Sequence, residues 1–312
     1  MSGPKLHPQA QAVLDAHRAA GETPLTLDAF RREAAKRPPL PGPDLRSADY
    51  EVHGAGGGKF AVRVYWPDGT GPFPALVYLH GGGFVVGSVE THDGFCRTLA
   101  AELGCVVASI GYRLAPEHRF PIPVADAYTG LSWVHESADE INVDHTRLAV
   151  GGDSAGANLA TVTARQAKER RGPPLNFQVL YYPVTDLRAL DTPSYREFGK
   201  QGSFLTRAEM SWLRDQYLAD AAQRNDPSVS PLVATNLIGL PPTYLVTAEC
   251  DPLRDEGEAY AAALSASGVQ TTAERFAGQL HGFVRMYDRI DAGRAVIART
   301  AELMRPALGL GA

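Results

Sequence analysis

The sequence Gly-Asp-Ser-Ala-Gly at residues 152–156 is the feature that most constrains how this 312-residue chain can fold. It follows an apolar run, residues 148–150, and precedes an alanine-rich segment, residues 158–167, with the composition of a helix. A serine on a sharp turn between a buried strand and a helix has its hydroxyl pushed clear of the sheet. The glycines two residues before and after Ser154 let strand and helix pass closely, because they carry no Cβ. The turn therefore predicts a reactive serine, together with an oxyanion hole, an acid and a histidine, the last two following the serine in that order.

The length and composition are those of one large α/β domain with insertions, or of two smaller domains. Hydrophobic residues make up 44% and charged residues 21%, which is ordinary for a globular protein. The net charge of -5, with no block of Lys or Arg, gives no reason to expect nucleic acid or an anionic membrane as a partner. The first eight residues lack an apolar core, so no secretory signal is expected, and no stretch has the apolar length of a membrane span.

The three cysteines, Cys96, Cys105 and Cys250, are odd in number and have no metal-ligand spacing. They lie in apolar surroundings, so a disulfide framework is not expected. Buried free thiols in a reducing cytoplasm are the simpler interpretation, and the sequence therefore predicts a cytoplasmic protein.

From residue 74 onward, short apolar runs alternate with helical segments. Continuous apolar strands separated by helices indicate a mostly parallel sheet that is covered on both faces. The expected strands lie at residues 75–79, 106–110, 148–150, 177–181 and 244–248. Before them, residues 46–53 and 60–66 flank a glycine-rich turn and predict a hairpin.

Helical segments outside this alternation predict a cap. Residues 6–18 and 25–36 carry apolar residues at helical spacing, and the proline-rich residues 37–43 interrupt any helix. Residues 186–236 have no strand of their own but hold several aromatic residues and a capping box at residues 206–209. Those aromatic residues fit a lid over the sheet and ordinary helix packing equally well. The expected organisation is a helical cap segment at 1–45, the first part of an α/β core at 46–185, a cap or lid insertion at 186–236, and the second part of the core at 237–312.

The sequence His80-Gly81-Gly82-Gly83 directly follows the expected strand at residues 75–79. Three consecutive glycines let backbone N–H groups point at one spot, as the oxygen of a tetrahedral intermediate requires. We expect the oxyanion hole to consist of the N–H groups of Gly82, Gly83 and Ala155. A glycine-rich turn can also cradle a phosphate, but this one lacks the Lys-Ser/Thr of a P-loop and the second half of a dinucleotide fingerprint.

Two carboxylates compete for the role of the acid. Asp251 follows the expected strand at residues 244–248, so it faces the same edge of the sheet as Ser154. Asp255 lies about one helical turn further on, where capping a helix or holding Arg254 is the simpler role. The acid is therefore assigned to Asp251.

His281 is the expected base, in a glycine-flanked loop after the strand-like residues 272–276. Its neutral imidazole can take the proton of Ser154, while Asp251 holds the ring in the correct tautomer. Other histidines do not combine such a loop with a place after the serine and the acid: His53, His92, His118, His135 and His145.

Two further features are expected to be structural. Asp153 neighbours the serine on a sharp turn, so its side chain points elsewhere. Residues 112–117 form an organising loop in which Arg113 and Glu117 are expected to pair with each other.

With these residues in place, the chain resembles the bacterial hormone-sensitive-lipase-like carboxylesterases (family IV), a branch of the α/β-hydrolase fold. The motifs that carry the resemblance are His-Gly-Gly-Gly at 80–83, Tyr-Arg-Leu-Ala-Pro-Glu at 112–117, Gly-Asp-Ser-Ala-Gly at 152–156, Asp-Pro-Leu-Arg-Asp-Glu-Gly at 251–257 and His-Gly-Phe at 281–283. The resemblance covers nearly the whole chain and implies a mostly parallel central sheet flanked by helices, with a helical cap. The site residues that it implies are the triad Ser154, Asp251 and His281, the oxyanion hole Gly82, Gly83 and Ala155, and the structural residues His80 and Asp255.

The resemblance implies a serine esterase that hydrolyses short- to medium-chain acyl esters of small molecules through an acyl-enzyme, without a metal or cofactor. The implied oligomeric state is a monomer or a homodimer. An amidase or arylformamidase-like hydrolase on the same fold is an alternative, because a triad does not by itself separate esters from amides. A small-molecule receptor that has lost catalysis is a further alternative, although the serine, acid and histidine are all present.

Overall fold

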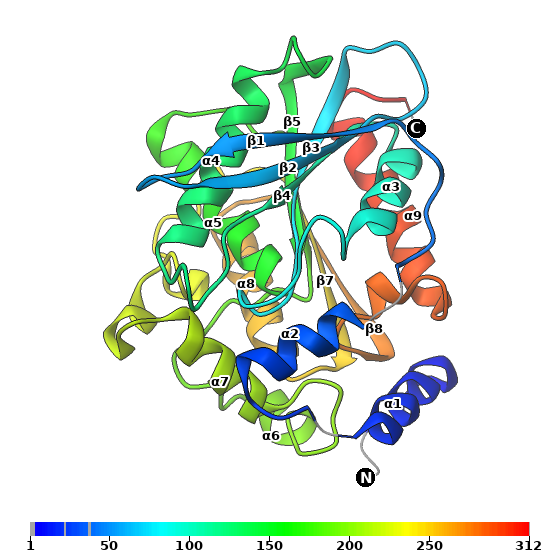
Figure 1. Cartoon of the computed structure of the whole chain (residues 1–312), viewed down its shortest axis with the longest axis vertical. Helices are drawn as coiled ribbons and strands as arrows, with labels where there is room; N and C mark the ends of the chain where they lie inside the picture. The colour runs from blue at the N-terminus through cyan, green and yellow to red at the C-terminus, as the bar shows by residue number, and fades with distance from the viewer. Residues whose placement is uncertain (1–3, 22, 37–38, 312) are drawn as a thin grey trace.

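In the described part of the chain, eight strands form one sheet in the order β1-β2-β4-β3-β5-β6-β7-β8. The computed structural model describes residues 4–21, 23–36 and 39–311, and Figure 1 shows its helices on both sides of this sheet. The strands are β1 (Ser47–His53), β2 (Lys59–Tyr65), β3 (Phe73–Leu79), β4 (Val106–Gly111), β5 (Val143–Asp153), β6 (Phe177–Tyr181), β7 (Thr243–Cys250) and β8 (Thr271–Leu280). Strand β2 is antiparallel to its neighbours β1 and β4, whereas the other neighbouring pairs are parallel. The predicted mostly parallel α/β fold and the predicted hairpin at its edge are both confirmed.

Both faces of the sheet are buried, as the continuous apolar strands predict. Alternate residues of a strand point to opposite faces. Leu76 and Tyr78 of β3 belong to one hydrophobic core, whereas Val77 and Leu79 belong to a second. The first core is covered by α3 (Asp93–Leu103) and α9 (Asp291–Ala307), and the second by α4 (Ile122–Glu136), α5 (Ala155–Arg170) and α8 (Arg254–Ala266).

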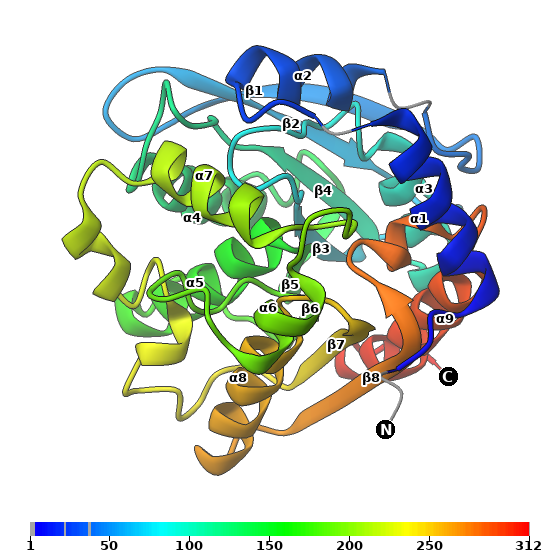
Figure 2. The same ribbon diagram turned by 90° about the horizontal axis from the view of Figure 1, so that it is seen from below.

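Several helices lie beyond the carboxyl ends of the parallel strands, as Figures 1 and 2 show. They are α1 (Pro8–Ala20), α2 (Leu27–Ala35), α6 (Pro193–Phe198) and α7 (Arg207–Tyr217). Helix α7 begins with the predicted capping box, in which Thr206 accepts from the N–H of Glu209 and the Glu209 carboxylate accepts from the N–H of Thr206. Residues 37 and 38 of the predicted linker lie outside the described residues. No helix in the described ranges combines the length and apolar composition needed to cross a lipid bilayer.

Helices α1 and α2 are held against the segment that contains α6 and α7. Phe30 of α2 stacks on Trp212 of α7, with ring centroids 4.7 Å apart. The Nε group of Arg18 in α1 donates a hydrogen bond of 2.7 Å to the carbonyl of Gly202. Two segments that are far apart in the sequence therefore cover the same edge of the sheet.

The predicted ion pair between Arg113 and Glu117 is wrong. Arg113 instead binds the fully buried carboxylate of Asp126 in α4, with Nη2 and Oδ1 2.7 Å apart. Glu117 receives two hydrogen bonds of 2.7 Å from the guanidinium of Arg31 in α2. Both partners come from other elements, so the spacing of Arg113 and Glu117 within one loop does not reveal them.

Candidate active site

Ser154 lies on the turn between β5 and α5 with φ 55° and ψ -118°, a conformation that side-chain-bearing residues rarely adopt. Its N–H donates a hydrogen bond of 2.9 Å to the carbonyl of Tyr181, at the end of β6. Its carbonyl accepts a hydrogen bond of 3.3 Å from the N–H of Val184. The neighbouring strand end thus holds both backbone groups of Ser154 and maintains the strained turn.

The glycines that flank Ser154 are required by close backbone approaches. A Cβ at Gly152 would lie 2.4 Å from the carbonyl oxygen of Leu79, and a Cβ at Gly156 would lie 1.9 Å from the same oxygen. Real Cβ contacts are essentially never this short. The strand–turn–helix arrangement predicted from the pentapeptide is therefore present, with α5 packed directly against the end of β3.

His281 lies between Ser154 and Asp251. Its Nε2 atom is 3.0 Å from the Ser154 Oγ atom, and its Nδ1 atom is 2.7 Å from Asp251 Oδ2. The other oxygen of the fully buried Asp251 carboxylate accepts the N–H of Leu253 at 2.9 Å. The structure thus brings the three residues into one hydrogen-bonded line.

The predicted loop around His281 is wrong in its extent, because β8 continues to Leu280. The pairing of β7 with β8 shifts register after Ala248 and resumes with Cys250 opposite Leu280. Gly278 adopts φ +66° within this shift, and its N–H donates a hydrogen bond of 2.7 Å to the Glu249 carboxylate. His281 and Asp251 are consequently the first residues after two paired strand ends.

Asp255 lies in the first turn of α8 and faces α6. Its carboxylate accepts the N–H of Ser194 at 2.8 Å and pairs with Arg254 at 2.8 Å. These contacts join α8 to the segment above the sheet, and Asp255 forms no hydrogen bond with His281 in the described part of the chain.

The glycine loop after β3 contains backbone N–H groups with no hydrogen-bond acceptor in the described part of the chain. Gly82 and Gly83 adopt φ +122° and +61°, and the carbonyl of Gly82 accepts hydrogen bonds from Val85 and Val86. Ala155 is the first residue of α5, so its N–H has no acceptor inside the helix. Among the residues that the structure describes, none accepts a hydrogen bond from the N–H groups of these three expected oxyanion-hole residues.

The histidines beside this loop are buried and neutral. Burial lowers the pKa of His80 to about 3 and that of His92 to about 4. His80 Nδ1 is 2.8 Å from the carbonyl oxygen of Gly81 and therefore donates its proton there. His92 Nε2 lies 3.2 Å from Asp153 Oδ1, away from Ser154. The His80 ring thus bonds within the loop, and the His92 ring contacts the Asp153 carboxylate.

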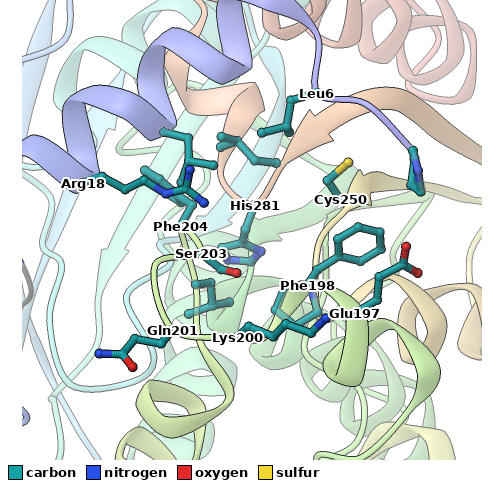
Figure 3. Close-up of a pocket in the computed structure, with 15 residues that line it drawn as sticks. Leu6, Arg18, Glu197, Phe198, Lys200, Gln201, Ser203, Phe204, Cys250 and His281 are labelled. Carbon is teal, nitrogen blue, oxygen red and sulfur yellow. The ribbon is translucent and has the colours of Figure 1, made fainter. Parts of the chain in front are cut away.

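A cavity of about 300 Å³ opens beside His281 (Figure 3). Its apolar residues come from α1 and the segment before it, from α6 and the loop after it, and from the end of β8: Leu6, Leu14, Phe198, Phe204, Leu205 and Leu280. Charged side chains also line it, namely Arg18, Glu197 and Lys200. The Cys250 thiol forms another part of the wall, and burial together with the charge of Glu249 raises its pKa to about 11. The cavity thus has a mixed apolar and polar wall, which includes the imidazole of His281.

Tyr182 is a site residue that sequence reasoning missed. It follows β6 directly, has φ +38° and is buried. Its ring meets the His281 imidazole edge-on, with centroids 4.9 Å apart and an interplanar angle of 60°. Its place immediately after a parallel strand, on the edge shared with Ser154, is the signal that could have identified it.

A strained serine turn, with a histidine and an acid that follow neighbouring strands and bond in line with the serine, defines an α/β hydrolase. The family model described as alpha/beta hydrolase fold matches residues 76–285. The chain belongs to this family, within its hormone-sensitive-lipase-like branch, and is a carboxylic ester hydrolase.

Known members of the family are similar over most of the chain. The carboxylic ester hydrolase LipN of Mycobacterium tuberculosis is 39% identical, over 97% of this chain and 83% of LipN. The ethyl acetate hydrolase of Pseudomonas putida is 37% identical, over 96% of this chain and 98% of that protein. The solved structure of a hyperthermophilic esterase from the archaeon Pyrobaculum calidifontis superposes with a TM-score of 0.89 at 39% identity, covering 97% of this chain and 98% of the other.

Proposed function

We propose that this chain is a serine carboxylesterase that hydrolyses short- to medium-chain acyl esters of small molecules, with Ser154, His281 and Asp251 as its catalytic triad. The observation that carries the proposal is the hydrogen-bonded line from the Ser154 hydroxyl through His281 to the buried Asp251 carboxylate, at 3.0 and 2.7 Å. Nucleophile, base and orienting acid lie within the distances that proton transfer requires.

The reaction follows from these positions. His281 Nε2 takes the proton of Ser154 as the Oγ atom adds to the ester carbonyl, and Asp251 stabilises the imidazolium that forms. The carbonyl oxygen becomes an oxyanion, to which Gly82, Gly83 and Ala155 offer N–H groups. His281 then gives the proton to the leaving alcohol, and water hydrolyses the acyl-enzyme by the same steps.

The dimensions of the cavity support a small substrate. Ligand pockets usually measure about 300–1,000 Å³. The cavity beside His281, at about 300 Å³, is at the lower end of that range, and part of its wall is apolar. The ethyl acetate hydrolase of Pseudomonas putida, a relative over nearly the full length of both chains, is named for a short ester. Both observations favour acyl chains of short to medium length.

The division of the chain into cap and core belongs to the same proposal. Residues 1–45 and 186–236 act as a cap over the core formed by residues 46–185 and 237–312. The cavity supports this division, because Leu14 from the first cap segment and Phe204 from the second both line it.

The compartment and the oligomeric state complete the proposal. Cys96 and Cys105 are buried free thiols, and reduced thiols suit a cytoplasmic location, which cell fractionation would test. A monomer or a homodimer is proposed, and analytical ultracentrifugation distinguishes the two.

The test is hydrolysis of p-nitrophenyl esters from acetate to palmitate by the wild type, Ser154→Ala and Ser137→Ala. Ser137 is the C-cap residue of α4, outside the proposed triad, and supplies the matched control. We expect activity to peak at short or medium chains and to fall by several orders of magnitude only in Ser154→Ala. Equal or faster turnover of palmitate would contradict the chain-length proposal. A folded wild type that hydrolyses none of these esters would contradict the proposed ester hydrolysis by the triad. Anilides and formamides would then be tested as substrates of an amidase.

A further inference from the structure

Two buried side chains hold the peptide that joins His80 to Gly81 from opposite sides. The Tyr112 hydroxyl donates a hydrogen bond of 2.7 Å to the carbonyl of His80. The N–H of Gly81 donates one of 2.9 Å to Oδ1 of Asp153. Both the carbonyl and the N–H of this peptide are therefore bound to side chains from outside the loop.

The next two peptides of the loop are also held at their carbonyls. His80 Nδ1 donates to the carbonyl of Gly81, and backbone N–H groups donate to the carbonyl of Gly82. In a planar trans peptide the N–H points opposite to the carbonyl. Holding the carbonyls of Gly81 and Gly82 therefore directs the N–H groups of Gly82 and Gly83 away from their anchors.

The Asp153 carboxylate, which accepts the Gly81 N–H, is held in place by other buried groups. Its Oδ1 atom also accepts the Tyr78 hydroxyl at 2.8 Å and faces His92 Nε2 at 3.2 Å. Burial raises the pKa of the Asp153 carboxyl, but His92, the charge of Arg285 and the Tyr78 hydrogen bond outweigh burial and hold this pKa below its usual range. Asp153 is thus a carboxylate at neutral pH, a stronger acceptor than a neutral group.

Asp153 packs so closely against the loop that no side chain fits at Gly81. A Cβ at Gly81 would lie 2.4 Å from Asp153 Oδ2. Asp153 is also the residue before Ser154, so the nucleophile and the anchor of the glycine loop are adjacent in the chain. On the other side, the Tyr112 ring stacks on the His80 ring with centroids 4.2 Å apart.

We propose that Tyr112 and Asp153 are positioning residues that clamp the His80–Gly81 peptide, so that the N–H groups of Gly82 and Gly83 face the oxyanion. This inference rests on the proposed function. The clamp acts through the loop and touches no reacting atom. Its contribution lies in the transition state, because the oxyanion exists only after Ser154 has added to the carbonyl.

Tyr112→Phe tests the clamp, because it removes one hydroxyl and keeps the ring stacked on His80. Loss of one oxyanion donor costs about 10²–10³ in kcat, so a misdirected donor is expected to cost about tenfold or more, with KM within about twofold of the wild type. The matched control is Tyr260→Phe. Tyr260 is equally buried, and its hydroxyl bonds to Thr161 at 2.7 Å, away from the loop. We expect Tyr260→Phe to keep the kcat of the wild type.

A trifluoromethyl ketone supplies a second readout, since its adduct with Ser154 carries an oxyanion. Tyr112→Phe is expected to weaken its affinity by the same factor by which kcat/KM falls, while the midpoints of the pH–rate profile stay unchanged. Asp153→Asn keeps an acceptor oxygen and should retain more activity than Asp153→Ala, which removes it. If Asp153→Ala does not fold, the two tyrosine variants decide the question alone.

Equal losses of kcat in Tyr112→Phe and Tyr260→Phe would overturn the clamp, as would a Tyr112→Phe effect confined to KM. Ester hydrolysis by the wild type that depends on Ser154 is measured first. If this activity is absent, the proposed function and the clamp are both overturned. If it is present but Tyr112→Phe and Tyr260→Phe have the same kcat, the clamp alone is overturned.

Discussion

His281 Nδ1 and Asp251 Oδ2 lie 2.7 Å apart, although the two residues follow different strands. Their backbones are neighbours because Cys250 and Leu280, the last residues of β7 and β8, are paired in the sheet. The distance between acid and base is therefore set by strand pairing rather than by a mobile loop.

Asp251→Asn is expected to lower kcat by about 10³–10⁴, because an amide stabilises the wrong tautomer of His281 and does not stabilise its protonated form. Steady-state kinetics with a p-nitrophenyl ester provides the measurement. The matched variant is Asp255→Asn, whose carboxylate contacts Ser194 and Arg254 instead. We expect it to lower thermal stability and to leave kcat within about tenfold. A larger loss of kcat in Asp255→Asn than in Asp251→Asn would transfer the role of the acid.

Gly82→Ala is expected to abolish most activity. The added Cβ would lie 2.1 Å from the carbonyl oxygen of Val86, and φ at this position is +122°. The loop must shift, which changes the orientation of its N–H donors. We therefore expect kcat to fall by about 10² or more. The control is Gly57→Ala, also at positive φ, where the new Cβ meets no atom within 4 Å. It should lower the unfolding temperature with little change in kcat, and equal activity of the two variants would contradict this account of the loop.

Phe204→Ala is expected to shift the chain-length preference toward longer esters. Phe204 lines the cavity beside His281, and its removal leaves space for additional methylene groups. The ratio of kcat/KM for the octanoate and butyrate esters should rise by roughly tenfold or more, since each accommodated methylene is worth about 1–3 kcal/mol. The control is Phe73→Ala, because Phe73 is the first residue of β3, at the opposite end of the parallel strands from the cavity. An unchanged ratio in Phe204→Ala would show that the acyl chain of these esters does not occupy this cavity.

Stability should fall as the pH is lowered below about 6.5. The pKa of His80 is about 3 and that of His92 about 4 in the folded chain, whereas both are near 6.5 when unfolded. Between those values the unfolded chain binds more protons, so the free energy of unfolding decreases by up to about 1.4 kcal/mol per pH unit for each histidine.

The measurement is the free energy of unfolding by urea at pH 7, 6 and 5. His92→Gln should flatten the pH dependence, since one of the two buried imidazoles is gone. His53→Gln, a change at an exposed histidine, should preserve the dependence of the wild type. An unaltered slope in His92→Gln would contradict the burial-lowered pKa of His92.

The sequence by itself determined the features that depend on neighbours along the chain. Gly152 and Gly156 have to be glycines wherever a strand and a helix cross at a serine, so the turn at Ser154 was predictable. Continuous apolar runs are typical of strands buried on both faces, so the mostly parallel sheet was predictable too. The positions of Asp251 and His281 followed from the places of strands, since parallel strands end at one edge of the sheet.

Only the tertiary structure decided the features that depend on pairing between distant elements. Glu117 bonds with Arg31 rather than Arg113, because α2 packs over the loop that contains Glu117. Strand β8 extends to Leu280 because β7 offers it a partner beyond a register shift. The contacts of Tyr112 and Asp153 with the glycine loop also depend on elements that are distant in the sequence. Such contacts form when separate strands and helices pack together, and that packing leaves no periodic pattern in any single segment of the chain.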